Sequence, residues 1–244
     1  IYFYQVNLYR TLQIFIASHV LSATIVVYFL RPSFKSLGDR IFDVWNFNKE
    51  FGIHLYLGSI LPLSMTSLAA IFVSYNSHNN AGVGYYTLAL SFVSLVPMIP
   101  NTIATDMFRD FSKMKSIPFE VTLSAFTLGL LGLLILAISI KPFILIFYGE
   151  SYKPVAYLVY IMMFGFLAHG MGDVLNRFLL ANGQGEMIRN CGIIIGSFSF
   201  CANLFLIPKF HETGAAIAMS ITGFAYLTIM AIYYIQFKAN IKRT

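Results

Sequence analysis

Three side chains that can carry charge or a proton recur at intervals of four residues within an otherwise apolar stretch. They are His169, Asp173 and Arg177, in FGFLAHGMGDVLNRFLLANGQG, residues 164–185. Residues four apart on an α-helix drift only about 40° around its axis, so neighbouring members of this stripe can meet along one face. An imidazole titrates near neutral pH and can exchange a proton with a carboxylate. What the stripe can do depends on whether its helix lies in water or in lipid.

The composition indicates that the helices of this chain lie in a lipid membrane. The chain has 244 residues, of which 58% are hydrophobic and only 11% are charged, against about 25% charged in an ordinary soluble domain. Its mean hydropathy is +0.73, and apolar runs of roughly 18 or more residues recur, which is typical of transmembrane helices. We therefore predict an integral membrane protein. The net charge of +6 is spread over separate loops, and no basic run is dense enough to predict a nucleic-acid partner.

We predict an all-α fold with about seven transmembrane helices. Each predicted span is a largely apolar run that is long enough to cross the hydrocarbon core. The spans cover residues 8–30, 51–75, 83–107, 118–140, 153–181, 187–208 and 214–237.

The basic residues of the connecting segments alternate between the two sides of the membrane. Segments 31–50, 109–115 and 176–190 and the C-terminal tail hold 12 of the 16 Lys and Arg residues, and the connections on the opposite side hold 3. Because cytoplasmic loops carry the excess of Lys and Arg, we expect the C-terminus and the 31–50 segment to lie in the cytoplasm.

The segment 31–50 has its own pattern. Apolar residues follow helical spacing from Phe34 to Phe51, charged residues fill the remaining positions, and the single tryptophan, Trp45, lies among the apolar ones. A charged amphipathic helix with a tryptophan is typical of the membrane interface. We interpret this segment as an in-plane linker between two helical bundles; the alternative is an ordinary solvated loop.

Prolines interrupt two of the spans. Pro97 and Pro100 lie within the third span and Pro62 within the second. A proline removes a backbone donor and kinks a helix, so these three are hinge candidates; the alternative is a static kink that serves packing. Asn101 follows directly and, with nearby serines, could line a wet cavity.

Two ionisable residues lie on the first span, where such groups are functional candidates by default. Arg10 and His19 are nine residues apart, which puts them on different sides of a helix. Arg10 could bind a diphosphate, because a guanidinium matches paired phosphate oxygens. The alternative is that Arg10 extends to the outer interface. No group of residues has metal-ligand spacing, so we predict no metal site.

Three interpretations of the 169–177 stripe stay open. In the first, Asp173 pairs with Arg177, and His169 stays neutral in the packing. In the second, Gly170–Asp173 interrupts the helix, and Asp173 caps the helix that follows. In the third, the stripe faces a cavity, and Asp173 or His169 titrates during transport, with coupling to protons or sodium ions.

Four stretches, in order, resemble one known family. GVGYYTLALSFVSLVPMIPNTIATDMFRDFSK (82–113) resembles the eighth-helix region of polysaccharide flippases, and IFYGESYKPVAYLVYIM (146–162) resembles their turn into the tenth helix. FLLANGQGEMIRN (178–190) resembles the turn after that helix, and NLFLIPKFHETGAAIAMSIT (203–222) resembles the passage from the eleventh helix into the twelfth. The chain is thus similar to the C-terminal half of the O-antigen and capsule type lipid-linked oligosaccharide flippases, within the multidrug/oligosaccharidyl-lipid/polysaccharide exporter superfamily.

The resemblance implies a twelve-helix transporter of two six-helix lobes. Residues 1–30 would be the last helix of the first lobe, 31–50 the interlobe linker, and 51–244 the second lobe with a short cytoplasmic tail. The rest of the first lobe would come from the same chain or from another. The implied function is to flip an undecaprenyl-diphosphate-linked oligosaccharide across the bacterial inner membrane by alternating access. One departure is IFVSYNSHNN (71–80), which lacks the acidic–basic pair that many relatives carry there.

Two other classes of function are alternatives to the flippase. A small-molecule or multidrug exporter coupled to ions would need a buried carboxylate, and Asp173 is the sole acidic residue well inside a predicted span. A membrane transferase would need carboxylates, histidines or a nucleophile clustered in a membrane-adjacent loop. The outer loops hold little of that kind, so we predict neither an enzyme activity nor a cofactor.

Overall fold

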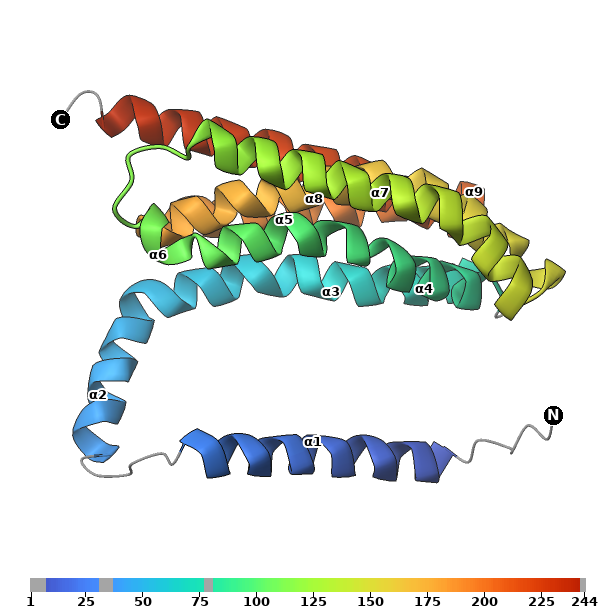
Figure 1. Ribbon diagram of the computed structural model, residues 1–244, viewed down its shortest axis with the longest axis horizontal. Coiled ribbons are helices and arrows are strands. Elements are labelled where there is room, and N and C mark those ends of the chain that lie inside the picture. Colours follow the sequence, from blue (N-terminus) through green and yellow to red (C-terminus); the bar gives the residue numbers. More distant parts are fainter. Residues whose placement is uncertain (1–7, 31–36, 77–80, 242–244) are drawn as a thin grey trace. The chain divides into compact units, whose positions relative to one another are not determined.

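The described residues form helices joined by short turns. The computed structural model describes residues 8–30, 37–76 and 81–241 (Figure 1), and no strand occurs within these ranges. Five of the described helices are long and apolar enough to cross a membrane: Leu12–Leu30, Ala81–Asp106, Phe119–Phe147, Glu150–Ala181 and Gly185–Ile241. The chain is therefore an all-α protein of multi-pass membrane character, as predicted.

The chain divides into two units after Asn48. In the first unit, α1 (Leu8–Leu30) is apolar and its described side chains are exposed, whereas α2 (Leu37–Phe47) is amphipathic and exposes Trp45. A π-helix, η1 (Asn48–Gly52), follows α2. The described part of the predicted linker is thus helical, and its role as a linker stays a prediction.

The second unit is a bundle built around one central helix. That helix, α8, packs against α4, α5, α7 and α9, and α9 also packs against α3. In the most apolar stretch of α8, 61% of the residues are buried, against 17% in that of α7. The helix α8 therefore occupies the middle of the bundle. The bundle comprises α3 (Ile53–Asn76), α4 (Ala81–Val93), α5 (Leu95–Asp106), α6 (Phe108–Phe111), α7 (Phe119–Phe147), η2 (Glu150–Tyr152), α8 (Lys153–Ala181) and α9 (Gly185–Ile241).

The last helix, α9, consists of two helical segments. His211 lies between them with φ 50° and ψ −128°, which is not helical. A Cβ atom on Gly214 would lie 2.2 Å from the carbonyl oxygen of Leu206, whereas residues eight apart on a continuous helix are about 12 Å apart. The chain therefore turns back at His211, within the connection predicted between residues 208 and 214.

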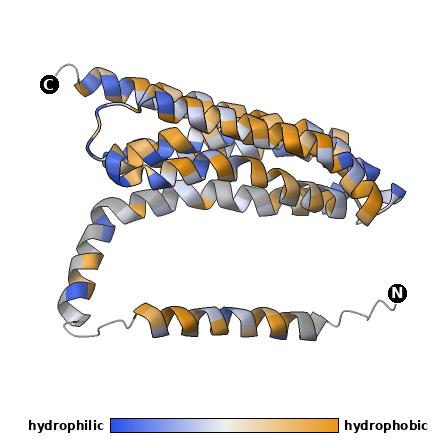
Figure 2. Ribbon diagram, viewed as in Figure 1, coloured by the Kyte–Doolittle hydropathy of each residue, from blue (hydrophilic) through white to orange (hydrophobic). Residues whose placement is uncertain are grey.

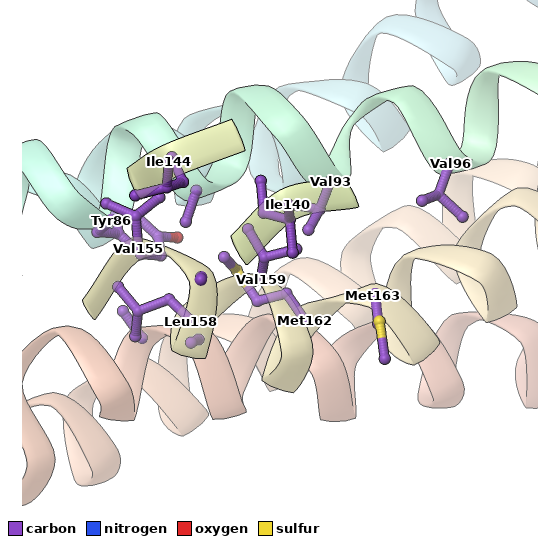
Figure 3. Packing of buried hydrophobic residues seen from close by; sticks show 14 of the residues in the cluster. Tyr86, Val93, Val96, Ile140, Ile144, Val155, Leu158, Val159, Met162 and Met163 are labelled. Carbon is purple, nitrogen blue, oxygen red and sulfur yellow. The ribbon is translucent and has the colours of Figure 1, made fainter. Parts of the chain in front are cut away.

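The bundle has apolar side chains both inside and outside. Figure 3 shows part of the core, in which Tyr86 and Val93 of α4 lie among Ile140 of α7 and Val159 and Met162 of α8. Figure 2 shows that α7 is hydrophobic along most of its length. Several of its apolar side chains are exposed, among them Ile138, which is 78% exposed. A soluble protein rarely presents so large an apolar surface, but a helix that faces lipid does.

Glycines bring α8 and α9 into close contact. A Cβ atom on Gly223 would lie 2.0 Å from the carbonyl oxygen of Gly165, and one on Gly165 would lie 2.4 Å from the Cα atom of Ser220. Small residues let the backbones of transmembrane helices approach in this way. The crossing fixes which residues of α9 lie beside the polar stripe of α8.

Candidate functional site

The polar stripe lies on an uninterrupted helix. Since α8 is continuous from Lys153 to Ala181, the interpretation in which Gly170–Asp173 interrupts the helix is wrong, and Asp173 caps nothing. The glycines serve packing instead. A Cβ atom on Gly170 would lie 2.9 Å from the Cα atom of Pro97, and one on Gly172 would lie 2.6 Å from the ring of Tyr226.

Asp173 faces α9 and joins a polar chain there. The Tyr226 hydroxyl donates to Asp173 Oδ1 at 3.1 Å, and Asn176 Nδ2 donates to the Tyr226 hydroxyl oxygen at 2.9 Å. The bonds link side chains that are 53 and 50 residues apart in the sequence, so the α8–α9 contact creates them. The carboxylate is held by a neutral donor, and its second oxygen has no hydrogen bond to any described residue.

His169 completes this chain one turn before Asp173. Its Nδ1 atom lies 3.7 Å from Asp173 Oδ1, and its ring centroid lies 4.5 Å from that of Tyr226. The Nδ1 atom is buried and has no hydrogen bond to a described residue, although 46% of the side chain is exposed. An imidazolium here would form an ion pair with Asp173, and a neutral imidazole would leave the carboxylate free to take up a proton or a small cation.

Arg177 faces a different helix. Its Nε atom donates to Asn101 Oδ1 of α5 at 3.4 Å, and within the described residues it makes no ion pair with Asp173. The close Asp173–Arg177 ion pair of the first interpretation therefore does not form among the described residues. Residues four apart drift by about 40° around the helix axis, so Asp173 faces α9 and Arg177 faces α5. The polar stripe therefore contacts two different helices.

Asn101 connects Arg177 to a groove on α5. The groove has a volume of about 610 Å³ and is lined by Met98, Asn101, Thr102, Thr105 and Asp106. Within it, the Thr105 hydroxyl donates to the Asn101 carbonyl oxygen at 2.7 Å. The structure thus brings the predicted residues Arg177 and Asn101 near the Thr105 hydroxyl and the Asp106 carboxylate. These four polar groups lie near one end of the bundle.

The third span is interrupted beside the prolines. The α-helix ends at Val93 and begins again at Leu95, and Pro97 has no N–H to donate to the Val93 carbonyl. The buried Pro100 ring would lie 3.2 Å from a Cβ atom on Gly129 of α7. Pro62 lies within the continuous helix α3, and its side chain is outside the described residues.

The two candidates of the first span, Arg10 and His19, belong to the first unit. His19 Nδ1 lies 2.9 Å from the carbonyl oxygen of Phe15 in its own helix. Arg10 belongs to α1, but its side chain is outside the described residues. Among the residues that the structure describes, no three His, Cys, Asp or Glu side chains are grouped so as to hold a metal ion.

Tyr226 and Asn176 are the members of the polar chain between α8 and α9 that sequence patterns did not predict. Tyr226 is one of 15 tyrosines in an apolar chain, and no spacing along α9 distinguishes it from the others. Asn176 adjoins Arg177, yet its partner lies on another helix. The useful signal would have been the small residues Ser220 and Gly223 shortly before Tyr226, because small residues predict a close contact between helices.

No protein-family model, curated protein or solved structure matches this chain. The resemblance to the flippases therefore rests on the four sequence stretches alone.

Proposed function

We propose that this chain is part of a membrane transporter that flips an undecaprenyl-diphosphate-linked oligosaccharide across the bacterial inner membrane. Its product would serve the synthesis of a cell-surface polysaccharide, such as O-antigen or capsule. The observation that carries the proposal is the polar stripe of α8 inside an apolar bundle. Its Asp173 accepts a hydrogen bond from Tyr226 of α9, and its Arg177 donates one to Asn101 of α5. The resemblance of the four sequence stretches supplies the substrate class.

A polar path is what this substrate requires. A sugar headgroup with a diphosphate cannot cross hydrocarbon unaided, because unpaired charges and polar groups are very costly there. Polar side chains on inner helices replace part of the lost hydration, while the lipid tail remains in the bilayer. Arg177 and Asn101 offer donors for phosphate and sugar oxygens, and they adjoin the groove that ends at Asp106.

The proposed architecture is the second half of a two-lobe transporter. If α9 crosses the membrane twice, α3 crosses once and α4–α5 form one kinked span, the chain has seven spans. The last six would form one lobe, 31–50 would be the cytoplasmic linker, and 1–30 would belong to the other lobe. Transport would proceed by rocking of one lobe against the other, with the C-terminus in the cytoplasm.

A second candidate is an ion-coupled exporter of small molecules in the same superfamily. The specific observation in its favour is the carboxylate of Asp173, 3.7 Å from an imidazole and 3.1 Å from a phenol. Such a group can take up a proton or sodium ion at one stage of a cycle and release it at another. The flippase proposal can use the same coupling, so the two differ in cargo.

Export by a deletion strain separates the two cargoes. We expect a strain without the full-length gene to lose complete surface polysaccharide, to accumulate the lipid-linked oligosaccharide inside, and to regain export when the gene is restored. Efflux of a cationic dye should not change. A strain that keeps its polysaccharide but loses dye efflux would overturn the flippase proposal in favour of the exporter.

Pro97→Ala is expected to slow export about severalfold without reducing the amount of folded protein. The substitution returns a donor to the Val93 carbonyl and favours a straight helix, which would oppose bending at the α4–α5 junction. Export rate and protein level in membranes are the two measurements. Ser91→Ala, on the exposed face of the same span, is the control. A loss of folded protein with unchanged export per molecule would assign Pro97 to packing alone.

A further inference from the structure

A second pocket lies at the opposite end of α8 from Arg177. It has a volume of about 540 Å³ and lies between the end of α7 and the start of α8. Its polar lining consists of Lys141, Lys153, Tyr157 and Tyr160, and Ile144 and Leu145 contribute to its apolar wall. Neither the α8 polar group nor the α5 groove shares a residue with this pocket.

The two lysines differ in their partners. Lys153 forms an exposed ion pair with Glu150, and such pairs are weak enough to exchange for another anion. Lys141 makes no ion pair or hydrogen bond with any described residue. It lies six residues before the end of α7, about 9 Å along the axis, where a lysine stem can lie on apolar surface while its ammonium group reaches the interface.

The tyrosines place polar groups around the same opening. The Tyr160 hydroxyl donates to the Ala137 carbonyl oxygen at 3.1 Å, so its position is fixed. Tyr157 is 59% exposed, and its hydroxyl has no hydrogen bond to a described residue. Nearby rings of Phe143, Phe147 and Tyr148 pack together, as aromatic side chains do at a membrane–water interface.

An apolar track leads from this opening along the bundle. Ile138, one turn before Lys141, is 78% exposed, and Leu134, a further turn away, is 49% exposed. A ligand that fits both parts must carry a negative headgroup and a hydrocarbon chain. We propose that this pocket binds the phosphate of an anionic phospholipid, with an acyl chain along α7. The inference is independent of the proposed transport cargo.

Lipid titration of the purified full-length protein tests this site. Native mass spectrometry would measure the first binding event of dioleoylphosphatidylglycerol, of dioleoylphosphatidylcholine and of inorganic phosphate. We expect Lys141→Gln to weaken phosphatidylglycerol binding about fivefold, because it removes one charge attraction to the lipid phosphate within the pocket. Phosphatidylcholine binding should not change, and Lys141→Arg should retain phosphatidylglycerol binding.

Two further variants distinguish lipid binding at this pocket from attraction by the overall charge of the protein. Glu150→Gln releases Lys153 from its ion pair, so it should strengthen phosphatidylglycerol binding. Lys209→Gln removes the same charge as Lys141→Gln from an exposed position outside the pocket, so it should have no effect. Equal losses for the Lys141 and Lys209 variants, an equal loss of phosphatidylcholine, or tight binding of inorganic phosphate alone would each overturn the proposal.

Discussion

Asp173→Asn is expected to reduce export by about ten- to hundredfold while the protein remains folded. Asparagine keeps the shape of the side chain and can still accept the hydrogen bond from Tyr226, but it cannot carry a negative charge or take up a proton. A tenfold change in rate corresponds to about 1.4 kcal/mol, so this range corresponds to a barrier raised by about 1.4–2.7 kcal/mol when the group can no longer take up a proton. The measurement is surface polysaccharide in a deletion strain that carries the full-length variant, at several external pH values.

The neighbours of Asp173 and a distant carboxylate serve as comparisons. Tyr226→Phe removes the donor to Asp173 but keeps the ring against His169, so its effect should be smaller. Glu120→Gln makes the equivalent change at an exposed position in the first turn of α7 and should export normally. If Asp173→Asn exports at the normal rate at every pH, with a normal amount of protein, the carboxylate has only a structural role.

Gly223→Ala is expected to have the largest effect on folding. Its Cβ atom would lie 2.0 Å from the Gly165 carbonyl oxygen, and both atoms belong to packed helices that cannot yield without separating. Overpacking of this kind costs about 1–3 kcal/mol and sometimes more. We expect a fall of several degrees in the unfolding temperature in detergent, and less monodisperse protein by size-exclusion chromatography.

The same substitution at Gly84 is the matched control. Gly84 is helical, and a Cβ atom there would have no neighbour within 4 Å. Because alanine favours helix over glycine by up to about 1 kcal/mol, Gly84→Ala should leave the unfolding temperature unchanged or raise it slightly. Equal unfolding temperatures for the two variants would show that α8 and α9 do not meet closely at Gly165.

The positions of the helices could be predicted from local sequence patterns. The predicted span 153–181 coincides with α8, and the prolines of the third span lie beside the break between α4 and α5. The predicted span 118–140 ended too early, since α7 continues through Lys141 and Pro142 to Phe147. A lysine such as Lys141 does not have to end a span, because its stem can remain on the apolar surface.

The partners of the polar stripe could not be predicted in the same way. Helical spacing identifies neighbours along one helix, and it correctly brings His169 near Asp173. It does not say which other helices lie beside each residue. That choice depends on close crossings such as Gly165–Gly223, and these crossings direct Asp173 to Tyr226 and Arg177 to Asn101.

Flipping in proteoliposomes tests the central proposal most directly. The full-length protein would be reconstituted with a fluorescent undecaprenyl-diphosphate-linked oligosaccharide, and its transfer between leaflets would be followed by quenching from outside. We predict that the protein accelerates transfer and that Asp173→Asn removes most of the acceleration, whereas Glu120→Gln does not. Correctly folded protein that gives no acceleration over empty vesicles, but releases a small cationic dye, would contradict the flippase proposal.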